Sequence, residues 1–188
     1  WVIHRRLRPE EYGARIHHTS RDEGPTYPVP EALLDSTAVA VTRREFDTYL
    51  LPQAYPEGSP THPSFPAGHA GQAGAMGTLL KCYFDCGARI PDPVKPDPAD
   101  MASLVGIDAD LTVAGEVNKL VANLCIGRNW AGIHYRSDAT AGVRMGERVA
   151  AAFLLDRVNA KRIDCAYEFE TFDGVDVRIE SGDEDIPE

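Results

Sequence analysis

The chain has 188 residues, of which 43% are hydrophobic and 26% charged, and its formal net charge is −10. This length suits a single hydrophobic core or one part of a larger domain. The acidic balance argues against duplex nucleic acid or an anionic membrane surface as a partner, so an anion would need a local cluster of cations. No apolar run approaches the length of a membrane span, and residues 1–8 lack signal-peptide organisation, which leaves the location of the protein open.

The first third of the chain predicts two helices separated by a loop. Pro9 and the two glutamates after it suit a first helical turn, because proline fits an early position and carboxylates fit the positive end of the helix dipole. We therefore expect a helix over residues 8–18. Residues 17–31 are rich in proline, glycine and charge and predict a loop. A second helix is expected over residues 42–51, where the following prolines end it.

The middle of the chain predicts three longer helices. Residues 68–86 are rich in alanine, glycine and leucine, which favours a closely packed core helix, and prolines forbid a regular helix in the next connection. Residues 112–128 form the clearest amphipathic helix, with Thr112 as its N-cap. Another helix is expected over residues 137–157. Its predicted core-facing residues are Val143, Val149, Phe153 and Leu154.

Only the tail is predicted to form strands. Residues 167–179 alternate in polarity on both sides of Asp173-Gly174, which is a strong hairpin signal. The predicted fold class is therefore mainly α with a short C-terminal β-hairpin. We expect a helical domain over residues 1–165, followed by the hairpin and an acidic tail over residues 166–188.

The four cysteines do not indicate a zinc site. Cys82, Cys86, Cys125 and Cys165 form no CxxC pair and have no histidine at zinc-finger spacing. Cys82 and Cys86 would share a helical face, where a disulfide is geometrically demanding. We expect buried free thiols, with a Cys82–Cys86 bridge as the alternative.

Three segments combine histidine or arginine with residues that bring backbone N–H groups close to a ligand. They are residues 4–9 (HRRLRP), 62–69 (HPSFPAGH) and 128–138 (RNWAGIHYRSD). Each segment alone has an ordinary structural explanation, such as a loop cap or a hydrogen-bonded histidine. Together they describe an oxyanion site.

Each part of this candidate site has a physical role. Two arginines of these segments can supply planar, permanently charged forks for the oxygens of an anion. Gly68 offers an unobstructed backbone N–H at the start of a helix. His69 is placed to donate or accept a proton, and His134 to attack or coordinate the central atom from the opposite side.

The order and spacing of these residues resemble the signature of the vanadium haloperoxidase and type-2 acid phosphatase superfamily. Arg8-Pro9 is similar to the end of its first motif and residues 66–69 (PAGH) to its second. In the third motif an arginine precedes a histidine by six residues and an aspartate follows it by four, as Arg128, His134 and Asp138 do here. The resemblance implies a helical-bundle core of that type.

Two features resemble the algal and cyanobacterial bromoperoxidases more than the phosphatases. They are His62-Pro63-Ser64, placed before His69, and the form of the segment around His134. In that branch a histidine matching His62 lines the peroxide and halide side of the cofactor. An exposed loop histidine is the alternative interpretation.

The resemblance implies a vanadate cofactor whose metal is bonded to His134. Its oxygens would be neutralised by Arg8, Arg128 and the Gly68 N–H. The implied catalytic residues are His62, His69 and His134, with His69 assisting proton transfer. Asp138 would orient a neighbouring basic residue or act as an N-cap.

The implied reaction is the oxidation of a halide, bromide first, by hydrogen peroxide to hypohalous acid that halogenates an organic acceptor. One alternative is a phosphatase in which His134 forms a phosphohistidine and His69 protonates the leaving group. Another is an anion-binding scaffold that has lost its activity.

Two departures from the superfamily pattern remain. Ala67 stands where the family commonly has serine, and a missing hydroxyl there should cost about 1 kcal/mol of oxyanion stabilisation. The motif lysine is absent because the chain begins inside the first motif. We expect an N-terminal remainder of the enzyme to supply that lysine from before Trp1 and to cover the helices at residues 68–86 and 112–128. A homo-oligomer is also expected.

Overall fold

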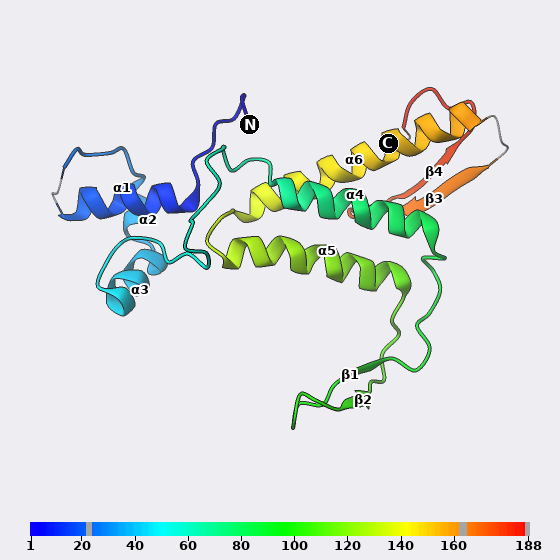
Figure 1. Ribbon diagram of the computed structural model, residues 1–188, viewed down its shortest axis with the longest axis horizontal. Coiled ribbons are helices and arrows are strands. Elements are labelled where there is room, and N and C mark those ends of the chain that lie inside the picture. Colours follow the sequence, from blue (N-terminus) through cyan, green and yellow to red (C-terminus); the bar gives the residue numbers. More distant parts are fainter. Residues whose placement is uncertain (22–23, 162–164, 187–188) are drawn as a thin grey trace. The chain divides into compact units, whose positions relative to one another are not determined.

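The computed structural model describes residues 1–21, 24–161 and 165–186, and these are mainly helical (Figure 1). The predicted fold class, mainly α with a C-terminal hairpin, is confirmed. None of the helices in the described ranges is both long and apolar enough to cross a membrane. The chain divides into two compact units. The first unit is Trp1–His69 with Leu124–Gly142, and the second is Ala70–Asn123 with Val143–Glu188.

The first unit begins with helix α1 (Pro9–Arg21). Pro9 occupies the first helical position as expected, with two glutamates in the first turn. The helix continues to Arg21, so the part of the predicted loop from residue 17 to residue 21 is helical. The short helix α2 (Glu31–Leu34) was not predicted.

Helix α3 (Thr37–Phe46) corrects the helix expected over residues 42–51. Its start is set by Ser36, whose side chain accepts the backbone N–H of Val39. Its end is set by Asp47, which adopts the left-handed conformation at φ 52°. The prediction relied on the prolines further on and missed both of these local signals.

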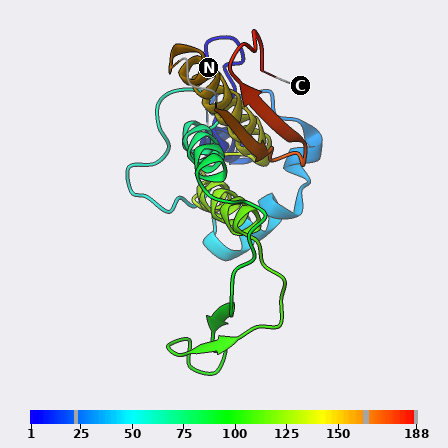
Figure 2. The same ribbon diagram turned by 90° about the vertical axis from the view of Figure 1, so that its right-hand side faces the viewer.

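Three long helices follow: α4 (Gly68–Tyr83), α5 (Val113–Trp130) and α6 (Arg136–Lys161). The parts of these three helices that belong to the second unit lie side by side (Figures 1 and 2). Thr112 is the N-cap of α5 as predicted, because its Oγ1 accepts the N–H of Gly115 at 3.1 Å.

Glycines allow α4 to approach its neighbours closely in the second unit. A Cβ atom added to Gly146 of α6 would collide with the carbonyl of Gly71 and lie 2.8 Å from the amide nitrogen of Ala75. A Cβ atom on Gly77 would lie 2.7 Å from the side chain of Val121 in α5. The small residues of α4 are therefore explained by close backbone packing.

The apolar core of the second unit lies between α6 and the C-terminal hairpin. Its buried residues are Ala151, Leu154, Leu155, Phe169, Val177 and Ile179. Leu154 faces this core as predicted, and Val143 is partly buried. The prediction for Val149 and Phe153 was wrong, because they are 60% and 53% exposed. They lie on the opposite side of the helix from the face that the hairpin covers.

The C-terminal hairpin pairs β3 (Ala166–Glu170) with β4 (Asp176–Glu180) in antiparallel register. Gly174 has φ 79° in the connecting turn, so the predicted Asp-Gly turn is confirmed. The expected domain boundary after residue 165 stays a prediction.

A second hairpin occupies the proline-rich connection between α4 and α5. It pairs β1 (Val94–Pro96) with β2 (Leu104–Gly106), although no strand was predicted there. The prolines do prevent a helix, but a short edge strand tolerates a residue such as Pro96 that lacks an N–H donor.

A buried lysine attaches α4 to the C-terminal hairpin. Lys81 is 1% exposed, its Nζ donates to the carbonyl of Glu170 at 2.5 Å, and it lies 3.8 Å from the ring centre of Phe172. Glu147 of α6 accepts the N–H of Phe172 at 2.8 Å. Burial raises the pKa of Glu147 and lowers the pKa of Lys81.

All four cysteines are free thiols, as predicted. Cys125 is buried, and the other three are partly buried. Burial and the neighbouring Cys86 raise the pKa of Cys82 to about 11, so this thiol is protonated at neutral pH.

Candidate active site

The three segments singled out in the sequence meet in the first unit. The fully buried Ser64 joins the first two, because its N–H donates to the carbonyl of Arg6 at 3.0 Å and its Oγ to that of Leu7 at 3.2 Å. Ala67 joins the second and third, because its N–H donates to the carbonyl of Asp138 at 3.0 Å. Residues that lie far apart in the sequence are thus held together by backbone hydrogen bonds.

Arg8 lies at the centre of this arrangement and is 6% exposed. Its Nε donates to the carbonyl of His62 at 3.0 Å, and its Nη1 donates to the carbonyl of Ile133 at 3.1 Å and to Nε2 of His134 at 3.0 Å. Its Nη2 lies 3.2 and 3.4 Å from the two ring nitrogens of His62. Burial lowers the pKa of Arg8, and the neighbouring charge of Arg128 acts in the same direction.

His134 is 5% exposed and is fixed at both ring nitrogens. Its Nδ1 lies 3.1 Å from Oδ2 of Asp138. Because a carboxylate only accepts, this contact places the ring proton on Nδ1 and the lone pair on Nε2, toward Arg8. This is the tautomer that a metal ligand bonding through Nε2 requires.

Asp138 is fully buried, yet three donors satisfy its carboxylate. The first donor is Nδ1 of His134. The other two are Nη1 of Arg6 at 2.7 Å and the backbone N–H of Tyr135 at 3.1 Å. Burial opposes ionisation, but these hydrogen bonds outweigh it and hold the pKa of Asp138 below its usual value. Asp138 therefore orients His134. It is the third residue of α6 and not the N-cap itself, although it satisfies the N–H of Tyr135 just before the helix.

Arg128, near the end of α5, has a donor without a partner. Its Nε is buried and makes no hydrogen bond within the described residues, and its guanidinium carbon lies 5.8 Å from the ring centre of Tyr55. An unpaired buried N–H is costly, so an acceptor bound here would relieve that cost.

Gly68 is the first residue of α4, and His69 is the second. The side chain of His69 is largely exposed, and no hydrogen bond joins it to Arg8 or His134 in the described part of the chain. Partial removal from water lowers the pKa of His69, and the positive charge of Arg128 adds to this effect.

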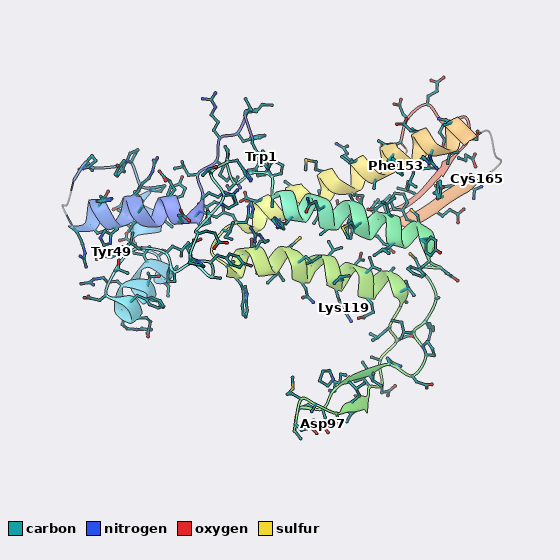
Figure 3. The ribbon with its side chains drawn as sticks, viewed as in Figure 1. Trp1, Tyr49, Asp97, Lys119, Phe153 and Cys165 are labelled. Atoms are coloured by element: carbon teal, nitrogen blue, oxygen red, sulfur yellow. The ribbon has the colours of Figure 1, made fainter. Side chains whose placement is uncertain are left out.

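Three residues near the site were not assigned roles from the sequence. Arg6 completes the carboxylate pairing of Asp138, and Ser64 binds the backbone of the first segment. Trp1, which is labelled in Figure 3, stacks on His62, and their ring centres are 3.8 Å apart. These contacts link residues more than 50 positions apart, so no local spacing in one sequence could have indicated them.

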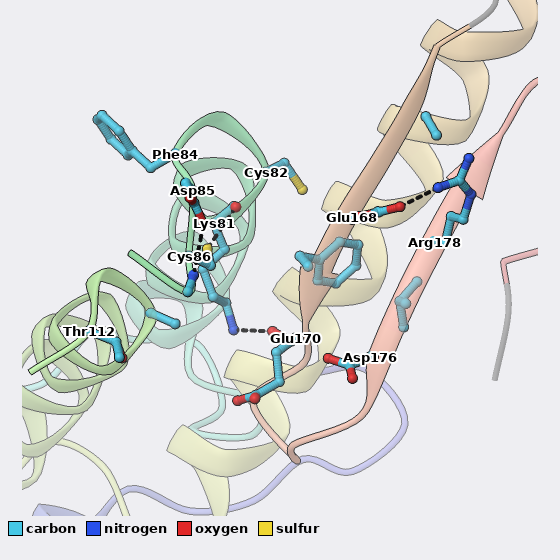
Figure 4. A pocket seen from close by; sticks show the side chains of 15 residues that line it. Lys81, Cys82, Phe84, Asp85, Cys86, Thr112, Glu168, Glu170, Asp176 and Arg178 are labelled. Atoms are coloured by element: carbon cyan, nitrogen blue, oxygen red, sulfur yellow. Dashed lines mark hydrogen bonds and ion pairs between the residues drawn. The ribbon is translucent and has the colours of Figure 1, made fainter. Parts of the chain in front are cut away.

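A cleft of about 850 Å³ in the second unit has a different character (Figure 4). It lies between the end of α4, the start of α5 and the C-terminal hairpin. Its cations are already paired, because Lys81 binds the carbonyl of Glu170 and Arg178 pairs with Glu168 and Glu180. No histidine lines it. The cluster of Arg8, His62 and His134 in the first unit therefore suits an oxyanion better than this cleft does.

Comparisons with known proteins show the family to which the chain is similar. Residues 28–160 match the family model of the VCPO second helical-bundle domain. The chain is 36% identical over 190 residues to a vanadium-dependent bromoperoxidase of Ascophyllum nodosum, which covers 95% of the chain and 34% of that protein. It is also 36% identical over 197 residues to the vanadium-dependent bromoperoxidases of Corallina officinalis and Corallina pilulifera, covering 94% of the chain and 33% of each.

The chain thus spans about a third of the length of these relatives. The matched family range includes His62, His69 and His134, whereas Arg8 lies before it. The resemblance found in the sequence motifs is confirmed: the chain belongs to the family of the VCPO second helical-bundle domain and is related to the vanadium-dependent bromoperoxidases.

Proposed function

We propose that this chain carries the vanadate-binding residues of a haloperoxidase that uses hydrogen peroxide to oxidise bromide to hypobromous acid. The observation that carries the proposal is the buried histidine His134, whose ring proton is held by Asp138 while its lone pair faces a buried arginine. The names of the relatives support the same cofactor and halide.

The residues present fit a bound vanadate. Arg8 and Arg128 bring two permanent positive charges, and Nε of Arg128 has no acceptor among the residues that the structure describes. A neutral imidazole nitrogen is a suitable ligand for the metal, and guanidinium donors suit its oxygens. In this fit His134 would bond to the metal, while Arg8, Arg128 and the N–H of Gly68 would bind its oxygens.

Arg8 has a further consequence for binding. Its Nη1 donates to Nε2 of His134, the nitrogen that would bond the metal, so in the bound state this N–H would be released from the ring nitrogen. The released donor is then free for an oxygen of the same anion. A hydrogen bond to a neutral nitrogen would be exchanged for one to a negatively charged oxygen, and the two backbone contacts of Arg8 would keep the guanidinium in place.

When bound, the vanadate would supply the Lewis acidity that makes peroxide reactive toward halide. The chain's own residues would hold charge and move protons around it. His69 is exposed and its pKa is lowered, so at neutral pH it is neutral and able to accept a proton from an incoming peroxide. His62 would line the side from which peroxide and halide arrive, and an organic acceptor would take up the oxidised halogen.

The test compares two reactions of the purified protein. Halogenation of a chlorinated ketone dye is measured with peroxide and bromide, with and without added vanadate, beside hydrolysis of a phosphomonoester. Halogenation that depends on vanadate is the expected result. Phosphomonoester hydrolysis without halogenation would replace the proposal with the phosphatase alternative, and the absence of both activities would favour an inactive scaffold.

A further inference from the structure

Trp1 contacts both ends of the loop that carries His62. Its indole stacks on the imidazole of His62, with ring centres 3.8 Å apart and planes inclined by 31°. Its Nε1–H donates to the carbonyl of Pro66 at 2.8 Å. Pro66 directly precedes Ala67 and the start of α4 at Gly68. One rigid side chain therefore spans the segment from His62 to the helix start.

The contacts of His62 with Arg8 do not fix the orientation of its imidazole ring. Its carbonyl is held by Nε of Arg8, and its Nδ1 lies 2.9 Å from the carbonyl of Pro63. Nη2 of Arg8 lies at nearly equal distances, 3.2 and 3.4 Å, from both ring nitrogens. A group in that position would collide with the carbon between the two nitrogens if it lay in the ring plane, so it lies toward a ring face. Arg8 therefore contacts the ring without fixing its orientation through one directional bond.

We propose that Trp1 is the positioning residue for His62, holding its imidazole against Arg8 at the rim of the anion site without binding the anion itself. The role in halide oxidation rests on the function proposed above. Trp1 is 47% exposed, so its removal should not unfold the protein. Contacts between aromatic rings stabilise a pair by more than its buried area alone would.

The variants needed are Trp1→Leu, which removes the stack, and Trp1→Phe, which keeps an aromatic ring but loses the bond to Pro66. Trp130→Leu is the matched control, because Trp130 is 88% exposed and lies at the end of α5. The first measurement is the proton NMR spectrum of the His62 ring, assigned by comparison with His62→Ala. An indole over the imidazole shifts the ring protons upfield. We expect Trp1→Leu to abolish this shift, Trp1→Phe to keep part of it, and Trp130→Leu to leave it unchanged.

The second measurement separates halide turnover from vanadate binding. Trp1→Leu should lower kcat/KM for bromide by about fivefold, change the vanadate Kd by less than about twofold, and have no added effect in a His62→Ala background. Trp1→Phe should restore most of the loss.

Unchanged His62 ring protons in Trp1→Leu would overturn the proposal, and so would a kinetic loss that persists in the His62→Ala background. An equal loss of vanadate affinity would assign Trp1 to the anion site and also overturn it. If the parent protein oxidises no bromide with vanadate, the proposed function fails, while the NMR comparison still decides whether Trp1 positions His62.

Discussion

Oδ2 of Asp138 lies 3.1 Å from Nδ1 of His134, and the two side chains are 0% and 2% exposed. The other carboxylate oxygen of Asp138 accepts from Arg6, so the carboxylate is held from two sides. The orientation and tautomer of His134 are therefore set before any ligand is bound. This preorganisation is the basis for the first prediction.

His134→Ala should abolish vanadate-dependent bromide oxidation, because no other residue in the motif offers a buried ring nitrogen to the metal. Vanadate binding by calorimetry and dye halogenation measure the effect. His4→Ala, which changes an exposed histidine that packs on Phe65, is the control and should stay active. Normal bromide oxidation by His134→Ala at saturating vanadate would show that the ligand assignment is wrong.

His62→Ala should lower halide oxidation far more than vanadate affinity. Arg8 is held through the backbone carbonyl of His62, and this contact survives truncation of the side chain. We expect kcat/KM for bromide to fall by about tenfold or more, while the vanadate Kd changes by less than about threefold. Steady-state kinetics and a vanadate titration provide the two numbers, and equal losses in both would remove the assigned role.

Ala67→Ser should keep the enzyme active with altered kinetics. Ala67 is 1% exposed and its N–H is already bound to the carbonyl of Asp138, so the loop should keep its path. An added hydroxyl that reaches an oxygen of the anion should tighten the vanadate Kd by about fivefold, equivalent to about 1 kcal/mol. Complete inactivation would mean that this loop is not part of the anion site.

Gly146→Ala should destabilise the second unit by about 3 kcal/mol or more, because the new methyl group would collide with the backbone of Gly71. Gly127→Ala is the matched change in another long helix, where an added Cβ meets no atom within 4 Å. It should stabilise the protein by about 0.5–1 kcal/mol through helix propensity. Urea unfolding of both variants checks the pair, and similar effects would contradict the close packing of α4 on α6.

Two carboxylates should give opposite pH dependences of stability. The pKa of Asp138 is lowered in the fold, so its stabilisation is present above the unfolded value of about 3.9 and is lost as the pH falls below it. The stability difference between the parent and Asp138→Asn should therefore shrink below about pH 4.

Glu147 has a raised pKa, so its charged form costs stability as the pH rises above the unfolded value of about 4.3. Glu147→Gln keeps an acceptor for the N–H of Phe172 and should gain stability relative to the parent between about pH 4 and pH 7. Urea midpoints measured from below about pH 4 up to about pH 7 test both variants. Differences that do not vary with pH would refute the assigned protonation states.

The sequence was sufficient for features that depend on local chemistry. The Thr112 cap, the Asp173-Gly174 turn and the helical spacing of the long segments are each encoded within a few residues. The burial of α6 was predicted less well. Val149 and Phe153 have the right spacing for a core, but the C-terminal hairpin covers the other side of the helix, and that choice is made by tertiary packing.

The candidate site divides in the same way. The motif residues were identified from their order, and the structure brings Arg8, His62, His134 and Asp138 into mutual contact. The partners that hold them, Arg6 and Trp1, lie more than 50 positions along the chain from the groups they contact. One sequence contains no signal for such long-range pairs, so their roles required coordinates.

The several contacts of Arg8 place a limit on how this site can be redesigned. Its guanidinium is the cation that would face the anion, and it also donates hydrogen bonds to the backbone carbonyls of His62 and Ile133. Lysine would preserve the charge, but its single nitrogen cannot replace three nitrogens in a fixed plane. A substitution of Arg8 would therefore change anion affinity and loop geometry together. Efforts to alter selectivity are better directed at Ala67 or His62, whose side chains do not hold two backbone carbonyls in place.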